Sequence, residues 1–515
     1  MASAALLLFL PVLLAQDPTV RDFKRYYPRA KDLYERVEYV KALKGIDDAG
    51  VADALLQFNV LRDPDPHIAA AGREVLAALP SEAARASMQV IVEKGKPPEN
   101  LAGIIRAAGE GKWVEYTPLL RPHLASKSEE VRLWTATSLG LLGDVESLPA
   151  FAQLAISDAL PLVRVAAVDA LGALGKGHED VAGPPLAAAV QDAALEVQTA
   201  ACMALRQVRV KEAIGPLVAL MEQGEGRILE QVYPTLVAIT DMQFRDDPAS
   251  WRNWWKQAEA SYVVPSDEEL AKRQAARAKA AEQYVPSQKS ASFMGVDTPS
   301  TSIVFVIDVS GSMEEDVTEK DGFRERGFTR FSKLEITKEE LARTIEGLGS
   351  NVRFNIIAFA TQVYPWRPKL VPANPLTLRS AKDFVQGLQP IGGQLAAARA
   401  SAGLKGSAGA DEGRTNTYAG LLAGLGIEIK DNQARTPVTG NDTEIPSDVD
   451  TVFFLSDGRP SVGELVEPDD IVDAVTELNR FRRVTLHTIA IGGFEKDFME
   501  ELARRNGGLF VDLGR

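Results

Sequence analysis

The sequence predicts a multidomain chain with two folds, an α-solenoid of paired helices followed by an α/β, doubly wound, mostly parallel sheet. The first observation is a helical pattern that recurs between residues 129 and 208. The second is an apolar run at 302–308 that ends abruptly in polar residues. The third is the alternation of strand and helix patterns from that run onwards. Because 515 residues are too many for one core, more than one domain is expected.

Composition excludes several classes of protein. With 45% hydrophobic and 25% charged residues, the chain has the balance of a soluble globular protein. A formal net charge of −14 argues against nucleic acid or an anionic membrane as the main partner. The single cysteine, Cys202, allows no internal disulfide, and its apolar neighbours favour a buried helical position over a reactive thiol. The four histidines are too scattered for a zinc motif.

The N-terminus begins with a short apolar run, residues 2–15, followed by polar residues. This pattern is similar to a secretory signal peptide cut near Ala15, although no Lys or Arg precedes the run. The run is too short for a membrane span and is interrupted by Pro11, so no integral span is expected. Export to the periplasm or the extracellular space follows from this interpretation. The alternative, a buried N-terminal helix, would leave the protein in the cytoplasm.

Self-similar segments make up the helical part. Val131, Val163 and Val197 occupy the same position in three apolar helices, at spacings of 32 and 34 residues, and a second apolar helix follows each copy. Two helices per period of just over 30 residues are typical of an α-solenoid. The shared pattern VRxxAxxALxxLG resembles the first helix of bacterial HEAT-type repeats. We therefore expect a HEAT-like solenoid over 20–262.

The end of this stack carries three tryptophans on one helix face, Trp251, Trp254 and Trp255. They are expected to close the last repeat, because terminal repeats must cover an otherwise open core; an exposed aromatic binding patch is the alternative. The Ala-rich and charged segment that follows lacks a wide apolar stripe and predicts an exposed helical linker, at 263–294.

The sheet domain is predicted over 295–515 from alternating elements. Strands are expected at 302–308, 352–359, 362–370, 451–456, 484–491 and 509–513, and helices at 332–348, 376–388, 417–430, 468–481 and 495–505. The strand at 362–370 contains prolines and should lie at a sheet edge. The segment 314–330 is expected to be a charged loop. The Ala/Gly/Ser-rich stretch 395–413 is expected to be a mobile insertion, with a lid over the site as the alternative.

Polar residues gather where two apolar strands end. Asp308, Ser310 and Ser312 leave the first strand, and Asp457 ends a second one. Thr415 stands in the loop before a helix. Ligands of open α/β sheets bind outside the carboxyl ends of the strands, and oxygen donors of this kind suit a hard divalent cation, above all Mg²⁺. Taken alone, Ser-Gly-Ser is also ordinary turn and helix-cap chemistry.

In combination, D-x-S-x-S, the downstream Thr and the later Ser-Asp-Gly resemble the metal-ion-dependent adhesion site of von Willebrand factor type A domains. The resemblance covers 295–515 and implies a metal set of Asp308, Ser310, Ser312, Thr415 and Asp457. It further implies that the two serines bind the metal directly, that the threonine does so directly or through water, and that the aspartates act through water. Mn²⁺ is expected to substitute for Mg²⁺, and Ca²⁺ stays open.

The resemblance implies a function as well. A carboxylate from an Asp or Glu of a protein partner would complete the coordination, which predicts a non-enzymatic, metal-dependent binding or adhesion protein. An alternative is an extracytoplasmic assembly scaffold in which the solenoid is the main binding surface and the metal is structural. A metal-assisted hydrolase is the least favoured class, because the sequence has no G-x-S-x-G, no H-E-x-x-H and no P-loop. No catalytic residue is therefore assigned. The oligomeric state is not predicted.

Overall fold

The computed structural model describes most of the chain. The described residues are 16–96, 98–224, 226–244, 247–278, 291–318, 320–393, 413–427, 429–430, 433–434, 449–457, 459–492 and 496–513. The predicted signal peptide at 1–15 lies outside them, as does nearly all of the predicted insertion at 395–413. The chain forms two compact units, Met1–Ala182 and Gly183–Arg515, and the border between them falls within a helix. The predicted domain border after residue 262 remains a prediction.

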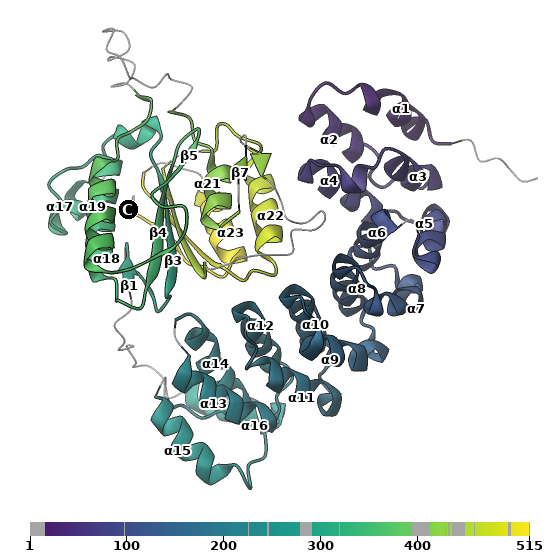
Figure 1. The fold of residues 1–515 in the computed structure, drawn as a ribbon, viewed down its shortest axis with the longest axis horizontal. Helices are drawn as coiled ribbons and strands as arrows, with labels where there is room; N and C mark the ends of the chain where they lie inside the picture. The colour runs from purple at the N-terminus through teal and green to yellow at the C-terminus, as the bar shows by residue number, and fades with distance from the viewer. Residues whose placement is uncertain are drawn as a thin grey trace, which may run out of the picture. The chain divides into compact units, whose positions relative to one another are not determined.

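The first unit consists of short helices. They are α1 (Pro18–Tyr26), α2 (Leu33–Lys41), α3 (Ala49–Gln57), α4 (Pro66–Ala77), α5 (Glu82–Lys94), α6 (Pro98–Glu110), α7 (Thr117–Leu120), α8 (Glu129–Leu142), α9 (Leu148–Ser157), α10 (Pro161–Leu174) and the start of α11 (Glu179–Ala189). Alternate helices pack on one another, α4 on α6, α6 on α8 and α8 on α10, while α3 packs on α5 (Figure 1). This is the packing of a helical-repeat stack, as predicted.

Hydrogen bonds between neighbouring repeats supplement the apolar core. Ser138 of α8 donates from Oγ to the backbone oxygen of Ile105 in α6, at 2.8 Å. Arg132 of α8 donates to both carboxylate oxygens of Asp158, at 2.6 and 3.0 Å, and Asp158 also accepts from the backbone N–H of Leu160 at the start of the next repeat. Charge-assisted pairs of this geometry fix the register between repeats.

The helices of the second unit continue the pattern. They are α12 (Leu195–Leu205), α13 (Ile214–Gln223), α14 (Ile228–Thr240), α15 (Pro248–Ala258) and α16 (Asp267–Ala278). Trp251 in α15 is fully buried and packs edge-on against Phe244, with ring centroids 5.1 Å apart. Because α15 packs on α13, Trp251 belongs to the core at the end of the stack, as predicted, whereas Trp254 and Trp255 are half-buried. Cys202 is buried in α12, and burial raises the pKa of its thiol to about 12.

The sheet has the strand order β11-β10-β9-β3-β4-β5, with β6 also paired to β4. The strands are β3 (Ser302–Asp308), β4 (Arg353–Phe359), β5 (Val363–Pro365), β6 (Val371–Pro372), β9 (Thr451–Ser456), β10 (Thr485–Ala490) and β11 (Phe510–Asp512). Strands β3, β4, β9, β10 and β11 run parallel to their neighbours, whereas β5 and β6 are antiparallel to β4. The doubly wound fold class is confirmed, and the proline-containing β5 lies at an edge, as predicted.

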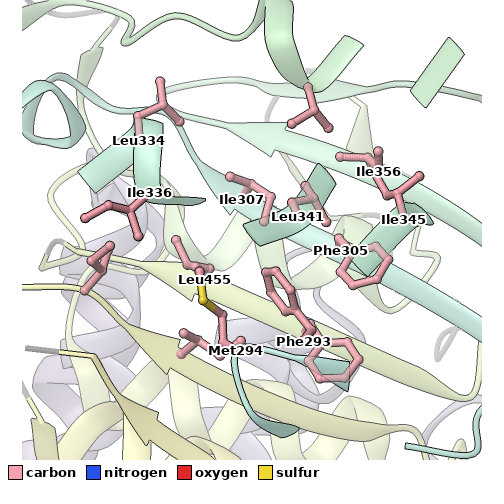
Figure 2. Packing of buried hydrophobic residues seen from close by; sticks show 14 of the residues in the cluster. Phe293, Met294, Phe305, Ile307, Leu334, Ile336, Leu341, Ile345, Ile356 and Leu455 are labelled. Carbon is pink, nitrogen blue, oxygen red and sulfur yellow. The ribbon is translucent and has the colours of Figure 1, made fainter. Parts of the chain in front are cut away.

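Helices cover both faces of this sheet (Figure 1). They are α17 (Lys320–Glu325), α18 (Lys333–Gly347), α19 (Pro375–Gly387), α21 (Thr417–Gly424), α22 (Pro468–Asn479) and α23 (Lys496–Arg505). Side chains of β3 alternate between the two cores: Phe305 and Ile307 face α18 and α19, while Val304 and Val306 face α21 and α22. Figure 2 shows the first core, where Phe293 of the hairpin β1 (Ala291–Phe293) and β2 (Val296–Thr298) packs against Phe305.

Two predicted elements in this domain had wrong boundaries. The strand expected at 362–370 is interrupted, leaving the short β5 and β6, because the prolines in this stretch remove donors that a continuous ladder needs. The helix expected at 417–430 ends at Gly424, since Gly426 has a φ of 74° and the two-stranded ladder of β7 (Ile429–Lys430) and β8 (Gln433–Ala434) follows.

The segment at 314–330 contains helix α17 rather than only a loop. Its Phe323 is buried and packs edge-on against Phe328, with ring centroids 5.7 Å apart, so this charged segment has an apolar anchor. Among the described helices, none combines the length and the apolar character that crossing a membrane would require.

Candidate metal centre

The site forms where β3 and β9 end side by side. The two strands are parallel neighbours with Ile307 paired to Leu455, so the residues that follow them emerge at the same edge of the sheet. Asp308 is the last residue of β3, and Asp457 follows the last residue of β9. Both are buried, although each is a carboxylate. The parallel pairing thus brings together two acids that are far apart in the sequence.

Asp308 is held by neutral donors. Its Oδ1 accepts from the backbone N–H of Ser310 at 2.8 Å, and its Oδ2 accepts from Oγ of Ser456 at 2.6 Å. Burial, and after it the negative charge of Asp457, together raise the pKa of Asp308 to about 7. The raised pKa means that the fold holds this carboxylate without enough positive charge beside it.

Ser310 and Ser312 connect Asp308 to Asp457, through the backbone N–H of Ser310 and the hydroxyls of both serines. The Oγ atoms of Ser310 and Ser312 lie 3.2 Å apart, and Ser312 Oγ donates to Oδ1 of Asp457 at 2.8 Å. The short turn η7 (Gly311–Glu314) begins directly after Ser310 and turns both hydroxyls towards the second strand. Four of the five residues predicted from the sequence are therefore in one hydrogen-bonded network.

Thr415 is tied through its backbone to Ser461, in the loop that follows Asp457, and not directly to the four-residue network. Its N–H donates to Ser461 Oγ at 3.0 Å, and the N–H of Ser461 donates back to the oxygen of Thr415 at 3.0 Å. Ser461 belongs to the loop that follows Asp457, so the two loops are fastened together. Helix α21 starts after Asn416, whose side chain accepts from the N–H of Ala419. The helix can lie close to the sheet because a Cβ at position 420, which is a glycine, would be 2.9 Å from the Phe359 ring.

A buried lysine that sequence reasoning missed completes the cluster. Lys333 Nζ donates to Oδ2 of Asp457 at 2.7 Å and to Oε2 of Glu315 at 2.9 Å. Burial alone would lower the pKa of Lys333, but the hydrogen bonds to Asp457 and Glu315 outweigh it and raise the pKa. One signal was present in the sequence: a lysine directly after the helix-capping Ser332 is unfavourable against the helix dipole, which suggests an acidic partner.

The donor set fits a hard divalent cation. Asp308 and Asp457 together carry two potential negative charges, whereas Lys333 supplies one positive charge. The remaining donors, at Ser310 and Ser312, are neutral oxygens that prefer Mg²⁺ or Mn²⁺ to softer metals. A divalent cation among these oxygens would relieve the electrostatic cost that raises the pKa of Asp308.

Comparisons with known proteins agree with this architecture. Residues 117–194 match the family model for HEAT repeats. Residues 329–416 and 432–512 match a model for the von Willebrand factor type A domain. These matched residues include Thr415 but begin after Ser312, so the match does not test the first site motif.

Similar curated proteins are much longer than the matched region. The inter-alpha-trypsin inhibitor heavy chain H4 of Homo sapiens is 29% identical over 219 residues, which is 42% of this chain and 18% of that protein. The heavy chain H1 of Mesocricetus auratus is 28% identical over 210 residues, which is 41% of this chain and 18% of that protein. This chain thus matches less than a fifth of the length of either relative.

Among solved structures, one similar chain is proximal thread matrix protein 1 from the mussel byssus, with a zinc-occupied MIDAS motif. It is 16% identical, with 41% of this chain and 43% of that chain covered, at a TM-score of 0.25. A von Willebrand factor type A protein from Catenulispora acidiphila is 18% identical at a TM-score of 0.27, with 42% of this chain and 39% of that chain covered.

Proposed function

We propose that this chain, in which a von Willebrand factor type A domain follows HEAT repeats, is a non-enzymatic protein that binds a protein partner through a metal. In this proposal Asp308, Ser310, Ser312, Thr415 and Asp457 hold Mg²⁺, for which Mn²⁺ can substitute. The metal supplies a positive centre for a carboxylate from an Asp or Glu of the partner.

The hydrogen-bonded line from Ser310 through Ser312 to Asp457 is the observation that carries the proposal. It places two neutral hydroxyl oxygens between two acids at the rim of a parallel sheet. Neutral ligands leave most of a cation's charge available to an incoming anion, whereas directly bound carboxylates would cancel it. Ser310 and Ser312 would therefore bind the metal, and Asp308 and Asp457 would orient its remaining waters.

The surroundings favour recognition over chemistry. A hydrolytic site would need a base within hydrogen-bond reach of an attacking water. Lys333 is held between Asp457 and Glu315 with a raised pKa, so it stays protonated and cannot accept a proton. Asp308 is engaged by Ser310 and Ser456. Binding without catalysis is the function that this arrangement supports best.

A second candidate function is an assembly scaffold with the solenoid as the main binding surface and a structural metal. Apolar side chains exposed on the helical repeats favour it: Val114, Leu141, Val145 and Ile156 all face solvent. Scattered exposed apolar residues are common on soluble proteins, so this observation is weaker than the site geometry. For either function we propose an exported protein, in the periplasm or the extracellular space.

Metal-dependent capture tests the proposal. The full chain would be immobilised and exposed to the extracytoplasmic fraction of the source organism with Mg²⁺, with EDTA, and with EDTA followed by excess Mn²⁺. A bound partner should be lost with EDTA, return with Mn²⁺, and be absent with Ser310→Ala or Thr415→Ala. Ser380→Ala, on α19 and outside the site, removes a hydroxyl that accepts a hydrogen bond from Arg367 and serves as the matched control. A partner that ignores both chelation and the site substitutions would make the metal a structural clamp and refute this function.

A further inference from the structure

Lys333 has an unexpected position for a lysine, because it is the first residue of α18 and yet is buried. The amino end of a helix carries a partial positive charge, which disfavours a cation there. Burial disfavours the charged form as well. Two acidic partners, Asp457 and Glu315, compensate for both costs.

Three segments hold the lysine in place. Its backbone N–H donates to the oxygen of Glu315 at 2.9 Å, which ties the start of α18 to the end of the first site loop. Its side chain passes Gly492, which follows β10 and has a φ of 98°. A Cβ at Gly492 would lie 2.8 Å from Cε of Lys333, so any other residue there would displace the lysine. The ammonium group therefore has little freedom to leave Asp457.

When no metal is bound, the positive charge of Lys333 balances the negative charge of Asp457. Both carboxylate oxygens are engaged, Oδ1 by Ser312 and Oδ2 by Lys333. Glu315, the other partner of the lysine, has a side chain that is 64% exposed, so solvent screens its charge. Removing Lys333 would leave Asp457 as a buried anion that accepts from the neutral Ser312. Such an anion is costly by itself and strongly attracts a cation.

We propose that Lys333 is a positioning residue that presets Asp457 for the metal and, by its own positive charge, weakens the binding of divalent cations. This inference rests on the proposed function, because it assumes a cation held by Ser310 and Ser312. Lys333 keeps Oδ2 of Asp457, so only the Oδ1 side faces the hydroxyls. The ammonium repels the incoming cation and makes metal loading reversible. A merely structural ion pair would have no such effect on metal affinity.

Calorimetric titration of the full chain with MgCl₂ tests this. Lys333→Met keeps most of the length of the side chain and removes its charge, so Mg²⁺ should bind at least ~10-fold more tightly, equivalent to about 1.4 kcal/mol. The matched control is Lys338→Met, on the same helix. Lys338 is similarly enclosed and pairs with Glu335 at 2.8 Å, outside the site. Its substitution should leave the Mg²⁺ affinity unchanged.

A second variant keeps the test decisive if Lys333→Met does not fold in the absence of metal. Lys333→Gln removes the charge but retains an N–H donor towards Asp457, and it should also bind Mg²⁺ more tightly than the wild type. Amide exchange in β3 and β9 would verify that each variant is folded before titration. Equal or weaker Mg²⁺ binding by the folded neutral variants would overturn the role of Lys333 and leave the proposed function standing. Absence of Mg²⁺ binding by the wild-type chain would instead refute the proposed function.

Discussion

Replacing Asp308 with Asn should stabilise the metal-free protein at alkaline pH while abolishing its response to Mg²⁺. Asn has the same shape and can still accept from the N–H of Ser310. Asn lacks the negative charge that is buried in the wild type. Burial and the charge of Asp457 make that charge unfavourable, and they raise the pKa of Asp308 to about 7. Because the folded state binds this proton more tightly than the unfolded chain does, stability falls as pH rises from the ordinary value of 3.8 to about 7.

The size of the effect follows from linkage. At roughly 1.4 kcal/mol per pH unit, the interval from 3.8 to about 7 corresponds to about 4 kcal/mol of unfolding free energy. In EDTA, Asp308→Asn and wild type should be nearly equal at pH 4, and the variant should be more stable by about 4 kcal/mol at pH 8. With Mg²⁺ at ~100 times its Kd, the wild type should gain about 2.7 kcal/mol and the variant nothing.

Amide exchange provides the domain-specific assay. Peptides covering β3 (Ser302–Asp308) and β9 (Thr451–Ser456) report the opening of the sheet rather than of the helical repeats. The quantity to compare is the difference between variant and wild type at each pH, which cancels the contributions of other titrating groups. A difference that does not change with pH would refute the account of Asp308 as an uncompensated buried acid. Equal Mg²⁺ protection in both proteins would refute its role at the metal.

Three further outcomes are expected. Arg132→Ala should destabilise the repeats by about 2 kcal/mol, because it removes the cation that pairs with the buried Asp158. Amide exchange in α8 and α10 would measure this loss of stability, and unchanged exchange would show that the ion pair is dispensable. Cys202 should react with a maleimide only on unfolding, since its thiol is buried and its pKa is raised to about 12; rapid labelling of the native chain would contradict this. His487 should stay neutral to about pH 4, because burial lowers its pKa to about 4, so its contribution to stability is lost as pH falls from 6.5 to about 4. His487→Gln should remove that loss in denaturant titrations at both ends of this interval, and an unchanged pH dependence would show that burial does not control the residue.

Sequence patterns located the strands of the site more accurately than its supporting residues. The apolar runs at 302–308 and 451–456 coincide with β3 and β9, because strands buried on both faces leave an unbroken apolar signature. Four of the five predicted metal residues, Asp308, Ser310, Ser312 and Asp457, stand at or just after the ends of such runs, whereas Thr415 stands in a loop before a helix. The helix predicted at 417–430 was less accurate, because α21 already ends at Gly424, before the two-stranded ladder of β7 and β8.

The residues that sequence reasoning missed act across long separations. Ser461 is 46 residues from Thr415, and Lys333 is 124 residues from Asp457, so neither contact has a local pattern. Ser456 looked like the polar end of a strand, yet it donates to Asp308 from a neighbouring strand, 148 residues away. Such partners can be predicted only when the strand order is known, because the strand order decides which loops lie next to each other at the edge of the sheet.

The packing of alternate helices in the first unit has a consequence for how this chain could change length. Each of α4, α6 and α8 presents one side to the helix two places before it and the other to the helix two places after. Val131 and Val163 stand 32 residues apart at equivalent positions, so a duplication or excision of one such period would reproduce the same junction. The array can therefore gain or lose whole repeats during evolution, and its length then changes without requiring a new hydrophobic core.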